Sequence, residues 1–275
     1  MTQIAAADVS KLRKSTGAGM MDCKKALEEA DGDFNKAIEI IRKKGQAVAS
    51  KRADREASEG VTLAGINQDG TLGAMIVLNC ETDFVAKNED FIRFAQQILD
   101  LALATEAADL DALKQLKLDG KPVADKIIEQ IGIIGEKIEL AFYSKIQAAF
   151  VTPYIHPGNR LSTLVGFNKK VEIQVAKDIA MQIAAMNPVA VDKENIPADI
   201  VEKEREIGRE QALREGKPEN IVDKIAEGKL NKFYKESTLL NQEFTKDSKK
   251  TVRQYLQEQD KELTVTEFLR YTLSV

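Results

Sequence analysis

The chain has 275 residues, 43% of them hydrophobic and 31% charged, a balance typical of a soluble globular protein. Its 40 basic and 44 acidic side chains leave a net charge of −4, which argues against a protein whose main task is to bind nucleic acid. With one histidine and two cysteines, the chain cannot build a histidine-rich metal site.

The sequence has no segment expected to cross or enter a membrane. Residues 1–14 lack the apolar run of a secretion signal, and no run of about 18 apolar residues is present. We therefore expect a cytoplasmic protein whose two cysteines, Cys23 and Cys80, stay reduced and buried as small hydrophobic residues.

The first 45 residues have the pattern of three short helices. The first helix is expected to end at a pair of closely spaced glycines, and the second covers residues 20–30. Asp33 can cap the third helix, and Gly45 occupies a position typical of a helix C-terminus. We assign residues 1–45 to a small helical bundle and residues 46–59 to a charged connector.

The pattern then changes to alternating strands and helices. Residues 61–66 and 72–78 are expected to form two strands of a hairpin, because Asn-Gln-Asp-Gly at 67–70 is a turn sequence. An amphipathic helix begins near residue 89. We assign residues 60–135 to a first core subdomain.

A similar order of elements follows. Residues 138–167 have the pattern of three strands, and a helix over residues 171–186 ends before Pro188. Because strands followed by a long covering helix occur twice, we predict an α+β core of two similar subdomains. The second comprises residues 136–189 and 236–275, with a helix near residue 248 and a last strand before the end.

Residues 190–235 interrupt the second subdomain. They carry eleven acidic and ten basic side chains, and Pro197 and Pro218 stand where two helices would begin. A narrow apolar stripe in the second half predicts a two-helix hairpin that resembles a coiled coil. The stripe consists of Val222, Ala226, Leu230 and Phe233.

Catalytic motifs are not evident. The glycines at 65 and 70 have the spacing of a phosphate-binding loop, but Thr71 stands in place of its lysine. A cysteine nucleophile would have only His156 as a base, with no second group to orient the pair. We therefore expect no enzyme, and no cofactor or metal bound by this chain.

Two segments are candidates for partner contact. Residues 79–88 lie between a buried strand and a strong helix, a position where loops often carry function. There Phe84 is either a core residue or an exposed anchor, and Asp83 either caps the next turn or lies beside that anchor. His156 lies in a Pro-Gly turn between strands, from which an imidazole can project.

Six segments, in order along the chain, resemble motifs of the bacterial elongation factor Ts family. They are TGAGMMDCKKAL at 16–27, GDFNKAIEIIRKKG at 32–45, ETDFVAKNEDF at 81–91, YIHPGNR at 154–160, AMQIAAMNP at 180–188 and GKPENIVDKIAEGKLNKF at 216–233. The resemblance implies a guanine-nucleotide exchange factor for the GTPase elongation factor Tu. It also implies that the N-terminal bundle is similar to a ubiquitin-associated (UBA) domain.

The family's functional residues can be matched to this chain. The resemblance implies that Phe84 enters a pocket near the partner's magnesium ion, with Asp83 beside it and Thr82 and Val85 completing the loop. Further partner contacts implied by the resemblance are Lys24, Ile134, Gly135 and His156. The family's apolar contact after the hairpin is not carried over, because Thr245 and Lys246 stand there.

One alternative comes from a different class of protein. A non-catalytic adaptor would use the N-terminal bundle to bind a protein partner, with the core as a scaffold. The helical hairpin could serve self-association, so a homodimer is left open.

Overall fold

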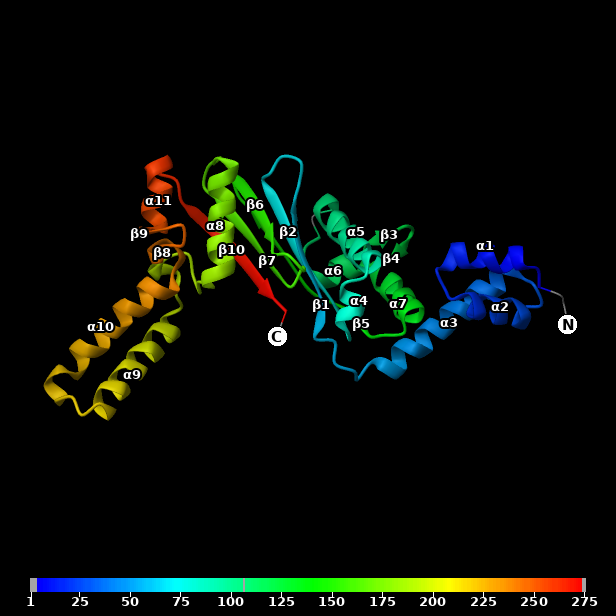
Figure 1. The fold of residues 1–275 in the computed structure, drawn as a ribbon, viewed down its shortest axis with the longest axis horizontal. Helices are drawn as coiled ribbons and strands as arrows, with labels where there is room; N and C mark the ends of the chain where they lie inside the picture. Colours follow the sequence, from blue (N-terminus) through cyan, green and yellow to red (C-terminus); the bar gives the residue numbers. More distant parts are fainter. Residues whose placement is uncertain (1–3, 106, 274–275) are drawn as a thin grey trace.

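A computed structural model describes residues 4–105 and 107–273, and its mixture of helices and small antiparallel sheets places the fold in the α+β class. The chain is elongated (Figure 1). Three N-terminal helices lie at one end, the sheets and their covering helices lie in the middle, and a helical hairpin projects at the other end.

The three N-terminal helices form a bundle with a core of its own. They are α1 (Ala6–Thr16), α2 (Met20–Glu29) and α3 (Phe34–Arg52). The buried core includes Leu12, Cys23, Leu27 and Ala37. Asp33 caps α3 as predicted, because its Oδ1 accepts hydrogen bonds from the backbone N–H groups of residues 35 and 36.

The prediction that the third helix ends at Gly45 is wrong, because α3 continues to Arg52. Gly45 is buried inside the helix and faces Gly132 of α7 (Val123–Ile134). A Cβ atom on Gly132 would lie 2.7 Å from the Cα of Gly45, so the two backbones are in direct contact. The glycine serves a close helix crossing instead of a helix end, and only residues 53–58 of the expected connector are irregular.

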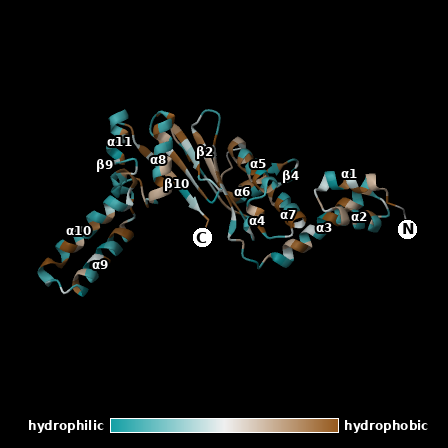
Figure 2. Cartoon of the chain, viewed as in Figure 1, coloured by the Kyte–Doolittle hydropathy of each residue, from teal (hydrophilic) through white to brown (hydrophobic). Residues whose placement is uncertain are grey.

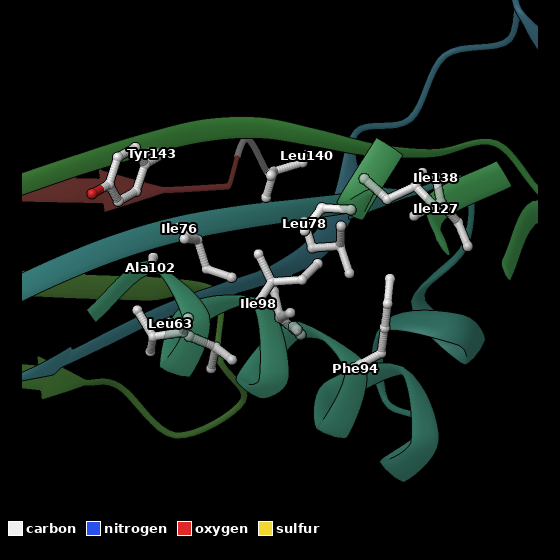
Figure 3. Close-up of a cluster of buried hydrophobic side chains, with 14 of the residues drawn as sticks. Leu63, Ile76, Leu78, Phe94, Ile98, Ala102, Ile127, Ile138, Leu140 and Tyr143 are labelled. Carbon is white, nitrogen blue, oxygen red and sulfur yellow. The ribbon is translucent and has the colours of Figure 1, made fainter. Parts of the chain in front are cut away.

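The first sheet contains β1 (Glu59–Ile66), β2 (Leu72–Cys80) and β5 (Ile138–Gln147), in the antiparallel order β1-β2-β5. The predicted hairpin is confirmed. The first of the three strands expected in residues 138–167 is predicted to belong to the second subdomain. This is wrong, because that strand, β5, pairs with β2 from Leu72–Gln147 to Cys80–Ile138. Helix α5 (Glu89–Thr105) covers this sheet through a large apolar cluster (Figure 3).

Short elements connect the first sheet to its helices. They are α4 (Asp83–Ala86), α6 (Leu110–Gln115), β3 (Lys117–Leu118) and β4 (Lys121–Pro122).

The second sheet has the order β10-β7-β6 and is also antiparallel. Its strands are β6 (Phe150–Ile155), β7 (Leu161–Phe167) and β10 (Val265–Thr272). Helix α8 (Ile173–Met186) packs on it as predicted. The two sheets are in contact, since the hydroxyl groups of Thr62 and Ser162 form a buried hydrogen bond between them.

The C-terminal helix begins later than predicted. Residues expected to start it near Ser248 instead belong to β9 (Asp247–Thr251), which pairs with β8 (Glu243–Phe244). Helix α11 (Val252–Gln259) starts after Thr251, because Thr251 and Gln254 form a reciprocal capping box.

The predicted hairpin consists of α9 (Ala198–Arg214) and α10 (Glu219–Ser237). Hydrophilic residues alternate with short hydrophobic stretches along both helices (Figure 2). Two short 3-10 helices, Lys193–Asn195 and Leu239–Asn241, lie at the base of the hairpin.

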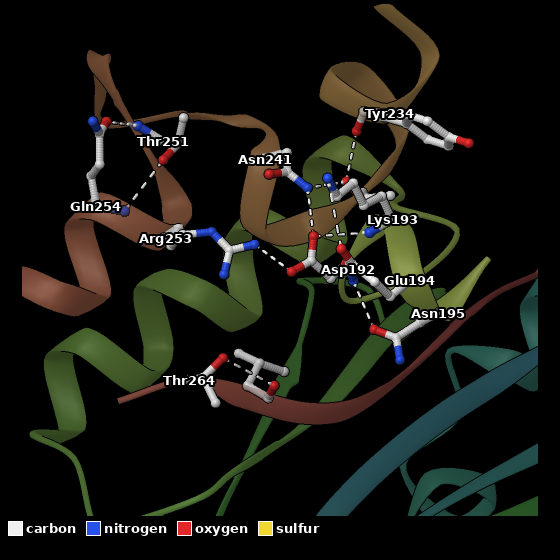
Figure 4. A network of polar contacts seen from close by, with 12 residues as sticks. Asp192, Lys193, Glu194, Asn195, Tyr234, Asn241, Thr251, Arg253, Gln254 and Thr264 are labelled. Carbon is white, nitrogen blue, oxygen red and sulfur yellow. Dashed lines mark hydrogen bonds and ion pairs between the residues drawn. The ribbon is translucent and has the colours of Figure 1, made fainter. Parts of the chain in front are cut away.

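Asp192 holds the base of the hairpin together (Figure 4). Its carboxylate accepts hydrogen bonds from Asn241 at 2.8 Å, from the backbone N–H of Lys193 at 2.9 Å and from Arg253. Burial alone would raise the pKa of Asp192, but these bonds outweigh it and the pKa lies below its usual value.

Candidate partner-binding site

Phe84 lies on the single helical turn α4, directly after β2. Its side chain is 84% exposed, whereas Ala86 of the same turn is buried against the core. Of the two interpretations left open by the sequence, a core position is therefore wrong: Phe84 is exposed. Thr82 caps the turn by accepting a hydrogen bond from the backbone N–H of Val85 at 3.4 Å.

Asp83 does not cap this turn. Its Oδ2 accepts a hydrogen bond from Lys87 Nζ at 2.6 Å, and this bond holds the pKa of the exposed Asp83 carboxyl below its usual range. Asp83 therefore stands ionised beside Phe84 at neutral pH.

Glu136, which follows α7, braces the segment that precedes Phe84. Its Oε2 accepts hydrogen bonds from the backbone N–H groups of Glu81 at 3.2 Å and Thr82 at 3.0 Å. Its Oε1 accepts from the Thr82 hydroxyl at 2.7 Å. One carboxylate thus accepts hydrogen bonds from three donors of the two residues that follow the paired part of β2.

The side chain of Glu81 makes the reciprocal contact with the segment that contains Glu136. Its Oε1 accepts a hydrogen bond from the backbone N–H of Lys137 at 2.6 Å, and both of its carboxylate oxygens lie within 2.9 Å of Arg52 Nη1. Burial raises the pKa of Glu81, but the bonds from Lys137 and Arg52 outweigh that effect and the pKa is lowered. We call the reciprocal contacts of Glu81 and Glu136 the carboxylate clamp.

The carboxylate clamp joins two of the predicted contact segments. Ile134 is the last residue of α7, and Gly135 ends the helix with a φ of 82°, a conformation that favours glycine. Because Glu136 is bonded to Thr82, the Ile134–Gly135 turn lies next to the Phe84 turn.

Cys80 supports the same segment from inside. Its thiol is buried and donates a hydrogen bond to the carbonyl oxygen of Thr82 at 3.2 Å. Burial, with the negative charge of Glu136, raises the pKa of Cys80 to about 12. The thiol therefore stays protonated at neutral pH.

His156 lies in the second sheet's β6–β7 turn, near the end of β2 that precedes Phe84. It is exposed in the turn between β6 and β7, where its Nδ1 and the hydroxyl of Tyr154 share a hydrogen bond of 2.8 Å. An ion pair between Arg160 and Glu59 holds this turn to the first sheet, and Glu59 lies opposite Cys80 in the β1–β2 register.

Lys24 is the predicted contact that lies elsewhere. It stands on α2 in the N-terminal bundle and pairs with Glu28 of the same helix at 3.8 Å. Contacts among the other segments bring together the Phe84, Gly135 and His156 turns. Figure 1 shows α2, the helix that carries Lys24, in the N-terminal bundle and away from α4.

Comparisons with known proteins point to a single family. A family model described as elongation factor TS matches residues 81–274. A curated elongation factor Ts of Porphyromonas gingivalis is 56% identical over 268 residues, covering 97% of both chains. Another, from Christiangramia forsetii, is 50% identical over 277 residues and covers 99% of this chain and all of its own.

The chain belongs to the elongation factor Ts family. It is therefore a translation elongation factor that takes part in protein biosynthesis as an exchange factor. Within the described ranges 4–105 and 107–273, no helix combines the length and apolar character needed to traverse a lipid bilayer. The same residues contain no group of three or more histidine, cysteine or acidic side chains placed to hold a metal ion.

In this member of the elongation factor Ts family, Thr245 and Lys246 make polar contacts within the chain. The backbone N–H of Thr245 donates to Gln182 at 2.8 Å, and Lys246 Nζ lies 2.7 Å from Asp178, whose side chain is only 7% exposed. The charged side chain of Lys246 thus has a partner inside the fold, whereas Thr245 bonds through its backbone.

Sequence reasoning missed two features that the structure reveals. Met20 and Met21 are 60% and 64% exposed at the start of α2, and the helical spacing of Met21, opposite the buried residues of that helix, could have indicated this for Met21. The role of Glu136 had no local indication, because its bonding partners lie about 55 residues away in sequence.

Proposed function

We propose that this chain binds elongation factor Tu in its GDP-bound form and promotes release of GDP. The ring of Phe84 enters a pocket near the partner's Mg²⁺ and displaces groups that hold the ion. Mg²⁺ bridges phosphate oxygens of bound nucleotides, so its displacement loosens the grip on GDP and allows GTP to bind next. The observation that carries this proposal is the 84% exposure of Phe84 on a braced turn.

Exposure alone would be unremarkable, since folded proteins expose many apolar atoms. What supports the proposal is that the exposed ring stands on a turn fixed at both ends. Thr82 caps that turn, Ala86 anchors it in the core, and Glu136 holds the segment before it. A side chain presented in one conformation loses less entropy on binding than a mobile one, which favours a wedge over a flexible loop.

The energetics require more than one residue. Weakening GDP binding by about four decades needs roughly 5.5 kcal/mol of differential binding, and by linkage GDP weakens this chain's binding equally. Truncation of one buried aromatic anchor costs about 2–4 kcal/mol. We therefore infer that Ile134, Gly135, His156 and Lys24 belong to a broad interface, on the order of 1,600 Å², that positions Phe84.

The proposal also assigns a separate role to each part of the chain. Residues 1–45 act as a UBA-like module that contacts the GTPase. Residues 60–189 and 236–275 form the two core subdomains that present the Phe84, Gly135 and His156 turns. Residues 190–235 form an inserted arm.

The test is release of a fluorescent GDP analogue from elongation factor Tu, measured by stopped flow. Phe84→Ala is expected to lower the release rate at least tenfold, because the wedge is lost while the fold is retained. Ile173→Ala is the matched control, since Ile173 is another exposed apolar residue, 65% exposed on α8, and should leave the rate unchanged.

Two results would contradict the proposal. An unchanged release rate in Phe84→Ala, with an unchanged melting temperature, would remove the wedge role. Failure of this chain to retain the GTPase from a bacterial lysate, or to release it when GDP and Mg²⁺ are added, would favour the adaptor instead.

A further inference from the structure

Helix α3 runs from the N-terminal bundle to Glu81, in the segment that precedes the Phe84 turn. It begins at Phe34 inside the bundle and ends at Arg52 beside Glu81. Its 19 residues correspond to about 28 Å at the usual helical rise. Figure 1 shows the helix running from α1 and α2 to the region below α4.

The path of α3 is fixed by backbone contact with α7. Gly45 and Gly132 touch where the helices cross, and a Cβ atom built at Gly17 would lie 3.0 Å from Ile133 of α7. Contacts this close leave little room for the helix to slide or rotate, because close-packed protein interiors have low compressibility and transmit strain. The position of Arg52 is therefore tied to the position of the bundle on α7.

Arg52 ends this path on the carboxylate clamp. Its Nη1 lies 2.9 and 2.8 Å from the two oxygens of Glu81, whose side chain is 16% exposed. Glu81 in turn fixes Lys137 through the backbone, and its own backbone N–H is bonded to Glu136. Arg52 is thus the cation hydrogen-bonded to the carboxylate that joins the two segments of the clamp, and the positive charge of Arg55 also acts on Glu81.

We propose that Arg52 is a positioning residue, which couples the N-terminal bundle to the Phe84 turn through Glu81. This inference rests on the proposed function, because the turn matters only if Phe84 acts on the partner. Loss of the guanidinium removes the cation that is hydrogen-bonded to Glu81 and lets the segment from Glu81 to Phe84 sample other conformations. Docking of the bundle on the GTPase then no longer fixes the direction of the ring.

The coupling is tested first on the chain alone, by hydrogen exchange and mass spectrometry. Arg52→Ala is expected to speed amide exchange in residues 82–88 about tenfold, because Ala86 and Lys87 donate to backbone oxygens of the braced turn. The β1–β2 turn at residues 67–71 serves as an internal reference and should not change. Arg42→Ala is the matched control, since it removes another α3 ion pair, to Asp125 at 3.0 Å, without touching Glu81.

The second test separates positioning from binding in the nucleotide release assay. Arg52→Ala should lower the saturating release rate about tenfold and leave the half-saturating concentration within about twofold. Arg52→Lys should restore most of the rate, because a single nitrogen spans both Glu81 oxygens and an ammonium group can do the same. The double variant with Glu81→Gln should be no slower than Glu81→Gln alone.

The outcomes distinguish this inference from the proposed function. If Phe84→Ala slows release and Arg52→Ala changes neither exchange in residues 82–88 nor the saturating rate, the coupling is refuted and the wedge stands. If Arg52→Ala changes only the half-saturating concentration, Arg52 acts in binding, which also refutes the inference. If Phe84→Ala leaves release unchanged, the proposed function itself fails.

Discussion

The carboxylate of Glu136 is expected to stabilise the Phe84 turn by a measurable amount. It accepts three hydrogen bonds, two from backbone N–H groups and one from the Thr82 hydroxyl, at 2.7 to 3.2 Å. Glu136→Gln keeps the size of the side chain but removes its charge and replaces one acceptor oxygen by a donor group. At least one of the three donors then loses its partner.

The magnitude follows from the difference between charged and neutral hydrogen bonds. A bond to a charged group contributes about 1.5–3 kcal/mol, and a neutral one about 0.5–1.5 kcal/mol. Three bonds weakened by about 1 kcal/mol each give about 3 kcal/mol, and partial exposure reduces this by about half. We therefore expect Glu136→Gln to lower the free energy of unfolding by about 1.5 kcal/mol.

The assay is urea denaturation followed by circular dichroism. The control is Glu139→Gln, because Glu139 lies on the same segment and its half-exposed side chain forms a long ion pair with Lys137, at 3.7 Å. Such pairs contribute between about 0 and 1 kcal/mol. Equal losses in the two variants, or a loss below about 0.5 kcal/mol for Glu136→Gln, would show that the clamp does not hold the turn.

The remaining predictions concern packing and the hairpin base. Gly132→Ala should destabilise the chain by about 1–3 kcal/mol, because its methyl group would overlap the backbone of Gly45. Gly228→Ala should stabilise it by about 0.5–1 kcal/mol, since nothing lies within 4 Å of a Cβ atom there; denaturation showing the same sign for both would contradict the helix crossing. Asp192→Asn should destabilise by about 1–2 kcal/mol at pH 7 by weakening the contact with Arg253. Because the folded-state pKa is lowered, that loss should shrink as pH falls below about 4, and a pH-independent difference in denaturation midpoint would refute it.

Local patterns predicted the elements whose signals lie within a few residues. Helix α5 begins at Glu89 as expected, and Phe91, Phe94 and Ile98 are buried on its inner face. The β1–β2 hairpin and the two-helix hairpin were equally predictable, because turn sequences and prolines mark their ends.

The features that the sequence could not predict depend on contacts between segments that are distant along the chain. Gly45 resembles a helix end locally, and only the position of Gly132 on another helix shows that it serves a crossing. The pairing of β5 with β2 depends on which strand edge is free after folding, and alternation within β5 does not specify that edge.

The same limit applies to the candidate site. The sequence identified the residues from Thr82 to Val85 as a segment on a rigid base but left the direction of Phe84 open. That direction depends on a cap at Thr82, a buried Ala86 and a carboxylate from beyond α7. The family resemblance supplied candidate contacts, and the fold then separated Lys24 from the others.

The polar groups of this site are bonded mainly within the chain's own fold. In the carboxylate clamp, Glu81 and Glu136 accept hydrogen bonds from the chain's own backbone, and Cys80 is held protonated. These groups are bonded within the fold and are not directed at an external substrate, whereas Phe84 is directed outward. An enzyme that transfers protons needs titratable groups within reach of its substrate. A site that uses Glu81, Glu136 and Cys80 to fix the backbone and presents a largely exposed hydrocarbon ring is suited to displacing groups in another protein.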